Sequence, residues 1–142
     1  MIIISHRGNI NGPNPDMENK PEYIKEALEK NLMVEIDVWK IADELYLGHD
    51  SPQYITNLDF LKQDNLICHA KNCFALETLI KHNIHCFSHN LDDVVLTSQN
   101  WLWTYPGKLL TPLSIAVLPE KCKNWDISDC KGVCTDFCNK YI

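Results

Sequence analysis

Short apolar segments rich in β-branched residues recur along the whole chain, separated by helical patterns or polar loops. Eight of them are typical of strands: Ile2–Ser5, Met33–Trp39, Glu44–Leu47, Leu66–Cys68, Cys86–Ser88, Trp101–Thr104, Ser114–Leu118 and Gly132–Thr135. The spacing of apolar residues predicts helices over Pro21–Lys30 and Phe74–His82, and a further helix over Asp92–Ser98. Strands that alternate with helical segments favour parallel βαβ units.

The length of the chain limits what those units can build. At 142 residues the chain is expected to be a single domain over residues 1–142, because domains average about 150 residues. A complete (β/α)8 barrel usually needs about 250 residues. Eight units in this chain leave about 18 residues each, enough for a strand and barely two helical turns. A barrel would therefore require several shortened or missing outer helices.

One predicted strand places two acids on the same side. Side chains alternate along Met33–Trp39, so Glu35 and Asp37 share one face while three apolar residues share the other. Adjacent carboxylates repel one another and are costly to bury without a counter-charge. A divalent cation that prefers oxygen ligands, Mg²⁺ or Ca²⁺, supplies that charge. The alternative is a half-exposed strand with a wet acidic face, and this strand alone leaves both interpretations open.

Polar residues follow the carboxyl ends of other predicted strands. Arginine is a natural bidentate partner for phosphate, and histidine exchanges protons near neutral pH. In parallel α/β architectures, active sites are built at this edge of the sheet. Glu18 and Asn19 precede the first predicted helix, and the residues at the strand ends are His6, Arg7, His49, Asp50, His69 and Lys71.

Taken in order, these residues carry a family resemblance. The motifs resemble those of the glycerophosphodiester phosphodiesterase family, which reads HRG, PEN-T, E-x-D-V and V-x-HD; here they are His6-Arg7-Gly8, Glu18-Asn19, Glu35-x-Asp37-Val38 and Leu47-Gly48-His49-Asp50. Two later segments are similar to the family's W-T and closing GV-x-TD strands, namely Trp103-Thr104 and Gly132-Val133-Cys134-Thr135-Asp136. The detailed match covers roughly the first fifty residues, and its specificity lies in the ordered set.

The resemblance implies a fold and an activity. The fold would be α/β, a compact (β/α)8 barrel of the TIM type with several outer helices shortened or missing. The activity would be metal-dependent hydrolysis of phosphodiesters, with His6 and His49 as general acid and base. Glu35 and Asp37 would hold the divalent metal, and Arg7 would bind the substrate phosphate.

The chain departs from the family at the third metal ligand. A later family strand offers E-x-K, and this chain has His69-Ala70-Lys71 at the matching place. Lys71 would help the arginine to neutralise the phosphate. Histidine suits Mg²⁺ and Ca²⁺ less well than carboxylate does. Either His69 is a softer third ligand, or the paired acids hold the metal with Glu18 and water. The expected cofactor is Mg²⁺ or Ca²⁺, with Mn²⁺ as a further candidate.

Charge and the N-terminus bear on partners and location. The net charge is −6, and no run of five or more Lys or Arg occurs, so nucleic acid is not an expected partner. The apolar run Ile2–Ile4 is too short for a signal peptide or membrane span. We therefore expect no transmembrane segment and a cytoplasmic location. The seven cysteines, odd in number and without an export signal, favour free thiols.

Three alternatives remain at this point. The leading one is a phosphodiesterase acting on a small soluble diester or a lipid head group. The second is a catalytically degenerate barrel that binds a phosphorylated ligand without turnover, and the third is a purely structural α/β domain. Trimmed outer helices would leave apolar barrel surface uncovered, so a homodimer that covers it is expected.

Some aromatic and histidine residues have less specific roles. His82 and His85 flank a helix end and a strand start, where surface or capping roles are expected. His89 is either a substrate contact or a surface residue. Trp103 and Tyr105 belong to an alternating aromatic stripe that is either core or a platform for substrate.

Overall fold

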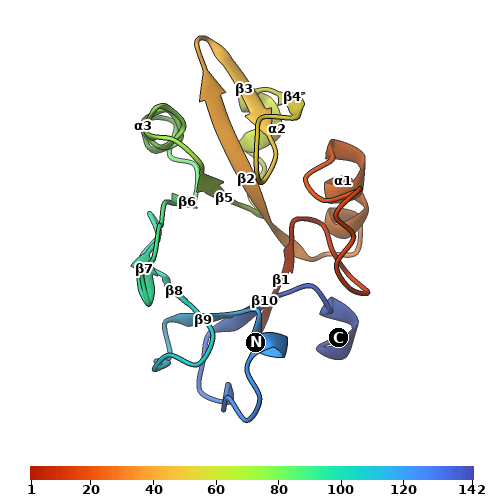
Figure 1. Ribbon diagram of the computed structural model, residues 1–142, viewed down its shortest axis with the longest axis vertical. Coiled ribbons are helices and arrows are strands. Elements are labelled where there is room, and N and C mark those ends of the chain that lie inside the picture. The colour runs from red at the N-terminus through yellow and green to blue at the C-terminus, as the bar shows by residue number, and fades with distance from the viewer.

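Ten strands form one curved sheet in the structure, a computed structural model that describes residues 1–142 (Figure 1). The strands are β1 (Ile2–His6), β2 (Met33–Ile41), β3 (Glu44–Leu47), β4 (Tyr54–Thr56), β5 (Leu66–Ala70), β6 (Cys86–Phe87), β7 (Val94–Leu96), β8 (Leu102–Thr104), β9 (Ser114–Val117) and β10 (Gly132–Thr135). The α-helices are α1 (Pro21–Glu29), α2 (Leu58–Leu61) and α3 (Cys73–Lys81), and single 3-10 turns span Pro119–Lys121 and Cys138–Lys140. All eight strands predicted from the sequence are present, each within two residues of its predicted ends.

Seven of the strands run parallel, in the order β6-β5-β2-β1-β10-β9-β8. At one end of this row β7 pairs with β8 in the antiparallel sense. The hairpin β3-β4 is also antiparallel and continues from the outer half of β2. Because β6 and β7 do not pair with each other, the sheet is an open arc, and Figure 1 shows it curving around a central region.

The predicted (β/α)8 barrel is wrong. The sheet is mixed and open, and only two connections contain a helix longer than four residues, α1 between β1 and β2 and α3 between β5 and β6. The connection from β2 to β3 is a tight hairpin, so it leaves no room for a crossover helix. The segments after β8 and β9 contain Pro106, Pro112 and Pro119, and proline interrupts a helix interior. Parallel βαβ units therefore occur only as β1-α1-β2 and β5-α3-β6.

Two local predictions also differ from the structure. The helix predicted over Asp92–Ser98 is wrong, since this segment contains β7, and its β-branched valines suit a strand. The surface or capping role expected for His85 is wrong as well, since this residue is only 5% exposed and its Nε2 lies 2.7 Å from Thr97 Oγ1. His82, in contrast, is the C-cap residue of α3.

Apolar side chains form a core on each side of the sheet. The larger cluster of 17 buried residues packs the convex side of β2 and β5 against the three helices, which contribute Ile24, Ala27, Leu61, Ala75 and Leu79. The smaller cluster of seven comes from strands alone and fills the inside of the arc. Successive residues of β2 point to opposite sides, so Val34, Ile36 and Val38 join the larger cluster while the two acids of β2 face the other way.

The unequal length of β2 determines where the next loop lies. β2 pairs with β1 only over Met33–Glu35 and with β5 as far as Val38. Its remaining residues extend beyond these neighbours and pair with β3, which returns until Leu47 lies opposite Val38. The antiparallel return therefore brings the loop after β3 back to the edge where the parallel strands end.

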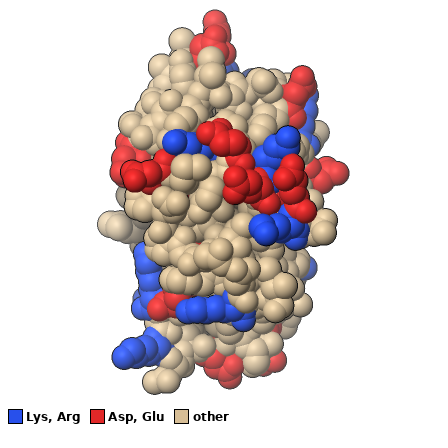
Figure 2. Space-filling model, turned by 90° about the vertical axis from the view of Figure 1, so that its right-hand side faces the viewer, with Lys and Arg blue, Asp and Glu red and all other residues tan.

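The surface, the helices and the cysteines each add one observation. On the face of the molecule shown in Figure 2, acidic and basic side chains are interspersed, without a continuous basic area. None of the helices has the length and apolar character needed to cross a membrane. All seven cysteines are free thiols.

Candidate active site

Side chains from the carboxyl ends of several strands surround one cavity of about 150 Å³, here named the main cavity. Six of the eight predicted site residues line it: His6, Arg7, Glu35, His49, His69 and Lys71. Asp37 is fully buried among them. Glu18 instead lines an adjoining side cavity of about 130 Å³, which shares Arg7 and His49 with the main cavity. The structure therefore brings together residues from positions 6 to 71 of the chain.

Asp37 is the most heavily contacted carboxylate. Its Oδ2 accepts a hydrogen bond of 2.9 Å from Asn19 Nδ2 and lies 3.2 Å from Arg7 Nε. Its Oδ1 lies 3.2 Å from His69 Nδ1 and 4.0 Å from Lys71 Nζ. Burial by itself raises the pKa of Asp37, but these partners outweigh it and bring the pKa to about 2. Asp37 is therefore ionised.

Glu35 has far less compensation. Its Oε2 lies 3.9 Å from His6 Nε2. Burial and then the charge of Asp37 raise the pKa of Glu35. Glu35 Oε2 is buried without a hydrogen-bond partner, whereas Asp37 Oδ1 is buried beside His69 Nδ1 at 3.2 Å. Buried polar atoms are rarely left without a partner, so Glu35 Oε2 points to a group that completes it.

A divalent cation fits this set of donors. Glu35, Asp37 and His69 each offer a ligand atom, and the three atoms lie within 4.8 Å of one another. Glu18 belongs to a different group, with His6 and Asp136, and its Oε1 lies 3.3 Å from Arg7 Nη1. Of the two interpretations left open by the sequence, the geometry favours His69 as the neighbour of the paired acids.

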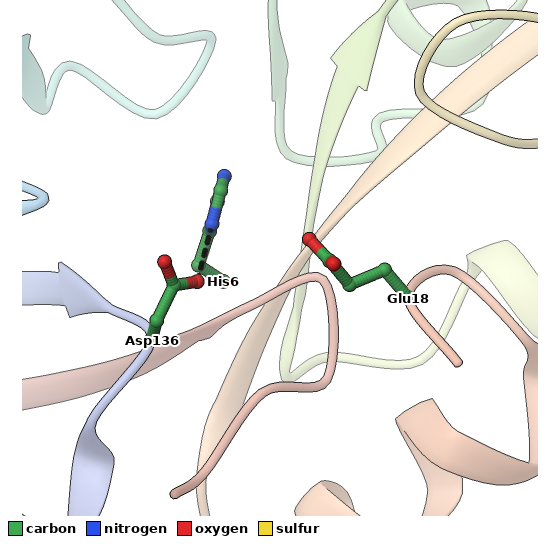
Figure 3. A group of neighbouring side chains, drawn as sticks. All are labelled: His6, Glu18 and Asp136. Carbon is green, nitrogen blue, oxygen red and sulfur yellow. Dashed lines mark hydrogen bonds and ion pairs between the residues drawn. The ribbon is translucent and has the colours of Figure 1, made fainter. Parts of the chain in front are cut away.

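His6 is held by an acid from the other end of the chain. Its Nδ1 lies 2.7 Å from Asp136 Oδ1, and Asn9 Nδ2 donates to the same oxygen over 2.9 Å. Figure 3 shows this pair, with Glu18 reaching toward it from a separate loop. Burial tends to lower the pKa of His6, but the bond to Asp136 and the charge of Glu35 outweigh that effect and raise it. His6 is thus disposed to carry a proton.

His49 has the opposite surroundings. Its Nδ1 lies 2.7 Å from Asp50 Oδ1, but its side chain is 43% exposed. Partial burial and the positive charges of Arg7 and Lys71 lower the pKa of His49. The chain turns just before His49, at Gly48, which has a φ of 153°. Glycine is required there because a Cβ would lie 2.0 Å from the Ser51 carbonyl oxygen. The neutral imidazole is therefore favoured at the mouth of the cavity.

The turn after β1 positions Arg7. This residue has a left-handed φ of 57°, a conformation that costs on the order of 1 kcal/mol for a residue with a side chain. Its amide donates to the Glu35 carbonyl oxygen over 2.9 Å, and its own carbonyl accepts from Asn19 N over 3.1 Å. These bonds hold the guanidinium beside Asp37 and Glu18.

Asp136 was not predicted as a site residue, and the sequence left roles at the site open for His89 and Tyr105. Asp136 follows β10, and the rule applied to the other strand ends would have identified it. Tyr105 and His89 line the main cavity after β8 and near the end of β6; their ring centroids lie 4.4 Å apart. With Phe87 and Trp103, whose centroids are 4.7 Å apart, they form what is named here the aromatic wall.

Comparison with known proteins adds no relative. No family model matches the chain, and no curated protein or solved structure matches it either. The functional interpretation therefore depends on the site geometry and on the motif resemblance.

Proposed function

We propose that the chain is a metal-dependent phosphodiester hydrolase of the glycerophosphodiester phosphodiesterase type. The observation that carries the proposal is the convergence on one cavity of two histidines with opposite pKa shifts, two cations and the buried acid Glu35, with Asp37 buried beside them. Environments that shift the pKa values of two titratable groups in opposite directions are typical of acid and base pairs in catalysis. The substrate would be a small phosphodiester or a lipid head group.

The two histidines would divide the proton transfers. Neutral His49 removes a proton from the attacking hydroxyl as its oxygen bonds to phosphorus. His6, protonated and hydrogen-bonded to Asp136, donates its proton to the oxygen of the leaving alcohol as the bond between that oxygen and phosphorus breaks. One proton is taken up and one is released, so the step is balanced. A second cycle with the roles exchanged restores both side chains.

The cations would bind the phosphate. Arg7 and Lys71 line the same cavity as both histidines, and both offer N–H donors to phosphate oxygens. Glu35, Asp37 and His69 would hold Mg²⁺, Ca²⁺ or Mn²⁺, which when bound supplies further positive charge to the phosphate. Asn19 fixes Asp37 by two hydrogen bonds of 2.9 Å, one to Oδ2 and one from the Asp37 amide.

The experiment is an assay of phosphodiesters with each of Mg²⁺, Ca²⁺ and Mn²⁺. The panel pairs diesters that carry a hydroxyl next to the ester with diesters that lack it, since attack by that hydroxyl would give a cyclic phosphate. We expect turnover of the first kind only, and rapid turnover of bis-p-nitrophenyl phosphate would instead indicate direct attack by water.

Variants connect the turnover to the site. His6→Ala and His49→Ala should each lower kcat at least about 100-fold, while the matched variant of an exposed histidine, His82→Ala, keeps full activity. Circular dichroism checks that each variant is folded. Retained activity in either of the first two variants would contradict the proposal.

One observation favours a second candidate, a binder of phosphorylated ligands without turnover. Asp37 Oδ1 already has His69 at 3.2 Å and Lys71 at 4.0 Å, so part of its charge is neutralised by the protein. Calorimetric titration separates the two candidates. Phosphate-ester binding with no metal binding and no turnover would favour the second.

A further inference from the structure

Two chemically different sets of side chains line the main cavity, the charged groups Glu35, Arg7 and Lys71 and the aromatic wall of Phe87, His89, Trp103 and Tyr105. His69 joins the two sets, because its ring centroid lies 4.9 Å from that of Phe87 and 5.0 Å from that of His89. Phe87 and Trp103 are at most 3% exposed and are packed into the inner core. The mechanism proposed above gives no role to the aromatic wall, which is left for another part of the substrate.

The aromatic wall carries two polar atoms with nothing to bind. His89 Nδ1 and Tyr105 Oη are both buried and lack a hydrogen-bond partner. Their rings are neighbours, with centroids 4.4 Å apart and planes inclined by 35°. In the side cavity, by contrast, Glu18 is paired with Arg7 and Asp50 with His49. Unsatisfied hydrogen-bonding capacity is therefore present at the aromatic wall, on rings of limited freedom.

The kind of group that fits follows from these donors and acceptors. A tyrosine hydroxyl both donates and accepts, and a histidine nitrogen does one or the other according to its tautomer. An alcohol hydroxyl also donates and accepts, so it satisfies both atoms in either tautomer. Its carbon atoms can pack on the Phe87 and Trp103 rings.

Size restricts the group further. A cavity of about 150 Å³ holds a molecule about as large as benzene. This is room for a small alcohol arm, and larger groups would extend out of the cavity into solvent.

We propose that His89 and Tyr105 form a specificity site for a hydroxyl on a small alcohol arm of the phosphodiester. The inference rests on the proposed function and adds the arm of the substrate that the cavity selects. Both histidines of the proposed mechanism line the same cavity as His89 and Tyr105. Because internal attack uses the hydroxyl of the arm that keeps the phosphate, the hydroxyl held by His89 and Tyr105 belongs to the arm that leaves.

The experiment compares two diesters of equal size, bis(2-hydroxyethyl) phosphate and 2-hydroxyethyl propyl phosphate. Both have a hydroxyl for internal attack, and they differ in one hydroxyl against one methyl. We expect the wild type to prefer the first about tenfold or more in kcat/KM, after correction for its two equivalent arms, because a site built for a hydroxyl rejects the analogue that lacks it. Tyr105→Phe and His89→Phe keep the rings, and each should reduce the preference to about threefold or less with the propyl ester still hydrolysed. Tyr46→Phe, on the β3 hairpin, is the matched control and should keep the full preference.

A binding measurement separates failure of this inference from failure of the proposed function. Calorimetry gives the affinities of 2-hydroxyethyl phosphate and propyl phosphate for the same proteins. If the wild type hydrolyses neither diester but binds the hydroxyethyl ester about tenfold more tightly, and Tyr105→Phe removes that difference, the specificity site stands and the proposed function fails. Equal kcat/KM for both diesters would overturn the specificity site and leave the proposed function standing. Absence of both turnover and binding would overturn both.

Discussion

At the scale of single residues, the different surroundings of His6 and His49 would determine which of them acts as the acid and which as the base. His6 is enclosed and has the carboxylates of Asp136 and Glu35 for neighbours. His49 is half exposed and faces the positive charges of Arg7 and Lys71. The same side chain can therefore act as acid in one place and as base in the other.

Asp136→Asn tests this assignment without changing the shape of the site. The carboxylate raises the pKa of His6, so the amide should lower it and His6 should lose its proton at a lower pH. The alkaline limb of kcat/KM then moves to lower pH, with a loss of about tenfold or more at pH 8 and a smaller loss at pH 5.5. Asp126→Asn, at an exposed carboxyl, is the control. An unchanged alkaline limb would argue against His6 as the acid.

His85 allows a prediction about stability and pH away from the site. Burial lowers its pKa from 6.5 to about 4, so the unfolded chain binds the proton more readily than the folded protein does. Its contribution is complete above pH 6.5 and is lost as the pH falls from there toward 4. We expect the free energy of unfolding to fall by on the order of 1–2 kcal/mol more between pH 7 and pH 4.5 in the wild type than in His85→Gln. Urea unfolding at the two pH values measures this, and parallel losses in both proteins would contradict it.

At the scale of elements, the strands were predictable because each is a local run of apolar, β-branched residues. β7 was mistaken for a helix because the acids before it resemble a capped first turn, whereas Asp92 accepts a hydrogen bond from the Asn90 amide in a turn. His49 lies at the edge of the sheet expected from the sequence, but the expected reason was incomplete. β3 runs antiparallel, and its end reaches the carboxyl ends of the parallel strands only because β2 extends beyond its neighbours. Strand direction depends on pairing between distant segments, which a local pattern does not contain.

The two asparagine helix caps differ in how many hydrogen bonds their side chains make. Asn57 Oδ1 accepts one hydrogen bond, from Phe60 N in α2. Asn72 Oδ1 accepts from Ala75 N in α3 over 2.9 Å, and the side chain also bonds the amide and carbonyl of Lys40 at the outer half of β2.

Asn72→Ala is therefore expected to destabilise more than Asn57→Ala. The loss at Asn57 should be about 0.5–1 kcal/mol, which is the ordinary cost of an N-cap. The loss at Asn72 should be about 2–3 kcal/mol, since two further bonds are removed. Urea unfolding of both variants gives the comparison, and equal losses would show that the link to β2 contributes nothing.

At the scale of the whole molecule, the closed barrel failed as a prediction because closure depends on segments with no regular pattern. The connections after β6, β8 and β9 are loops, and the row of strands stays open between β6 and β7. The site was more predictable than the closure, since most of its residues lie within the first 71 positions and follow strands. Asp136 joins it from the far end of the chain, through the parallel pairing of β10 with β1.

The homodimer stays a prediction. Large apolar side chains that are more than half exposed occur on separate elements and loops, including Ile55, Phe74, Leu91, Leu96 and Leu109. Because these residues belong to separate elements and loops, they do not identify one apolar face that a second copy would cover.

The charge of the whole molecule leads to a prediction about metal and stability. Glu18, Glu35, Asp37 and Asp136, which are part of the net charge of −6, lie close together at one edge of the sheet; Arg7, Lys71 and the protonated His6 of the proposed mechanism supply positive charge there. A divalent cation would offset the remaining negative charge, and a ligand that binds only the folded state stabilises it by mass action. At a hundred times its dissociation constant the gain is about 2.7 kcal/mol, which raises Tm by roughly 5–10 °C. Differential scanning calorimetry with Mg²⁺, Ca²⁺ or Mn²⁺, and again with EDTA, measures the change.

Glu35→Gln distinguishes a metal site from a general effect of salt. The glutamine removes the repulsion with Asp37, so without metal this variant should be more stable than the wild type by about 1 kcal/mol. It should also lose most of the metal-dependent rise in Tm, because a carboxylate ligand is gone. Glu29→Gln, at an exposed position of α1, should change neither value. A variant that is less stable without metal, or that keeps the full rise with metal, would mean that Glu35 is compensated by the protein itself and does not hold a cation.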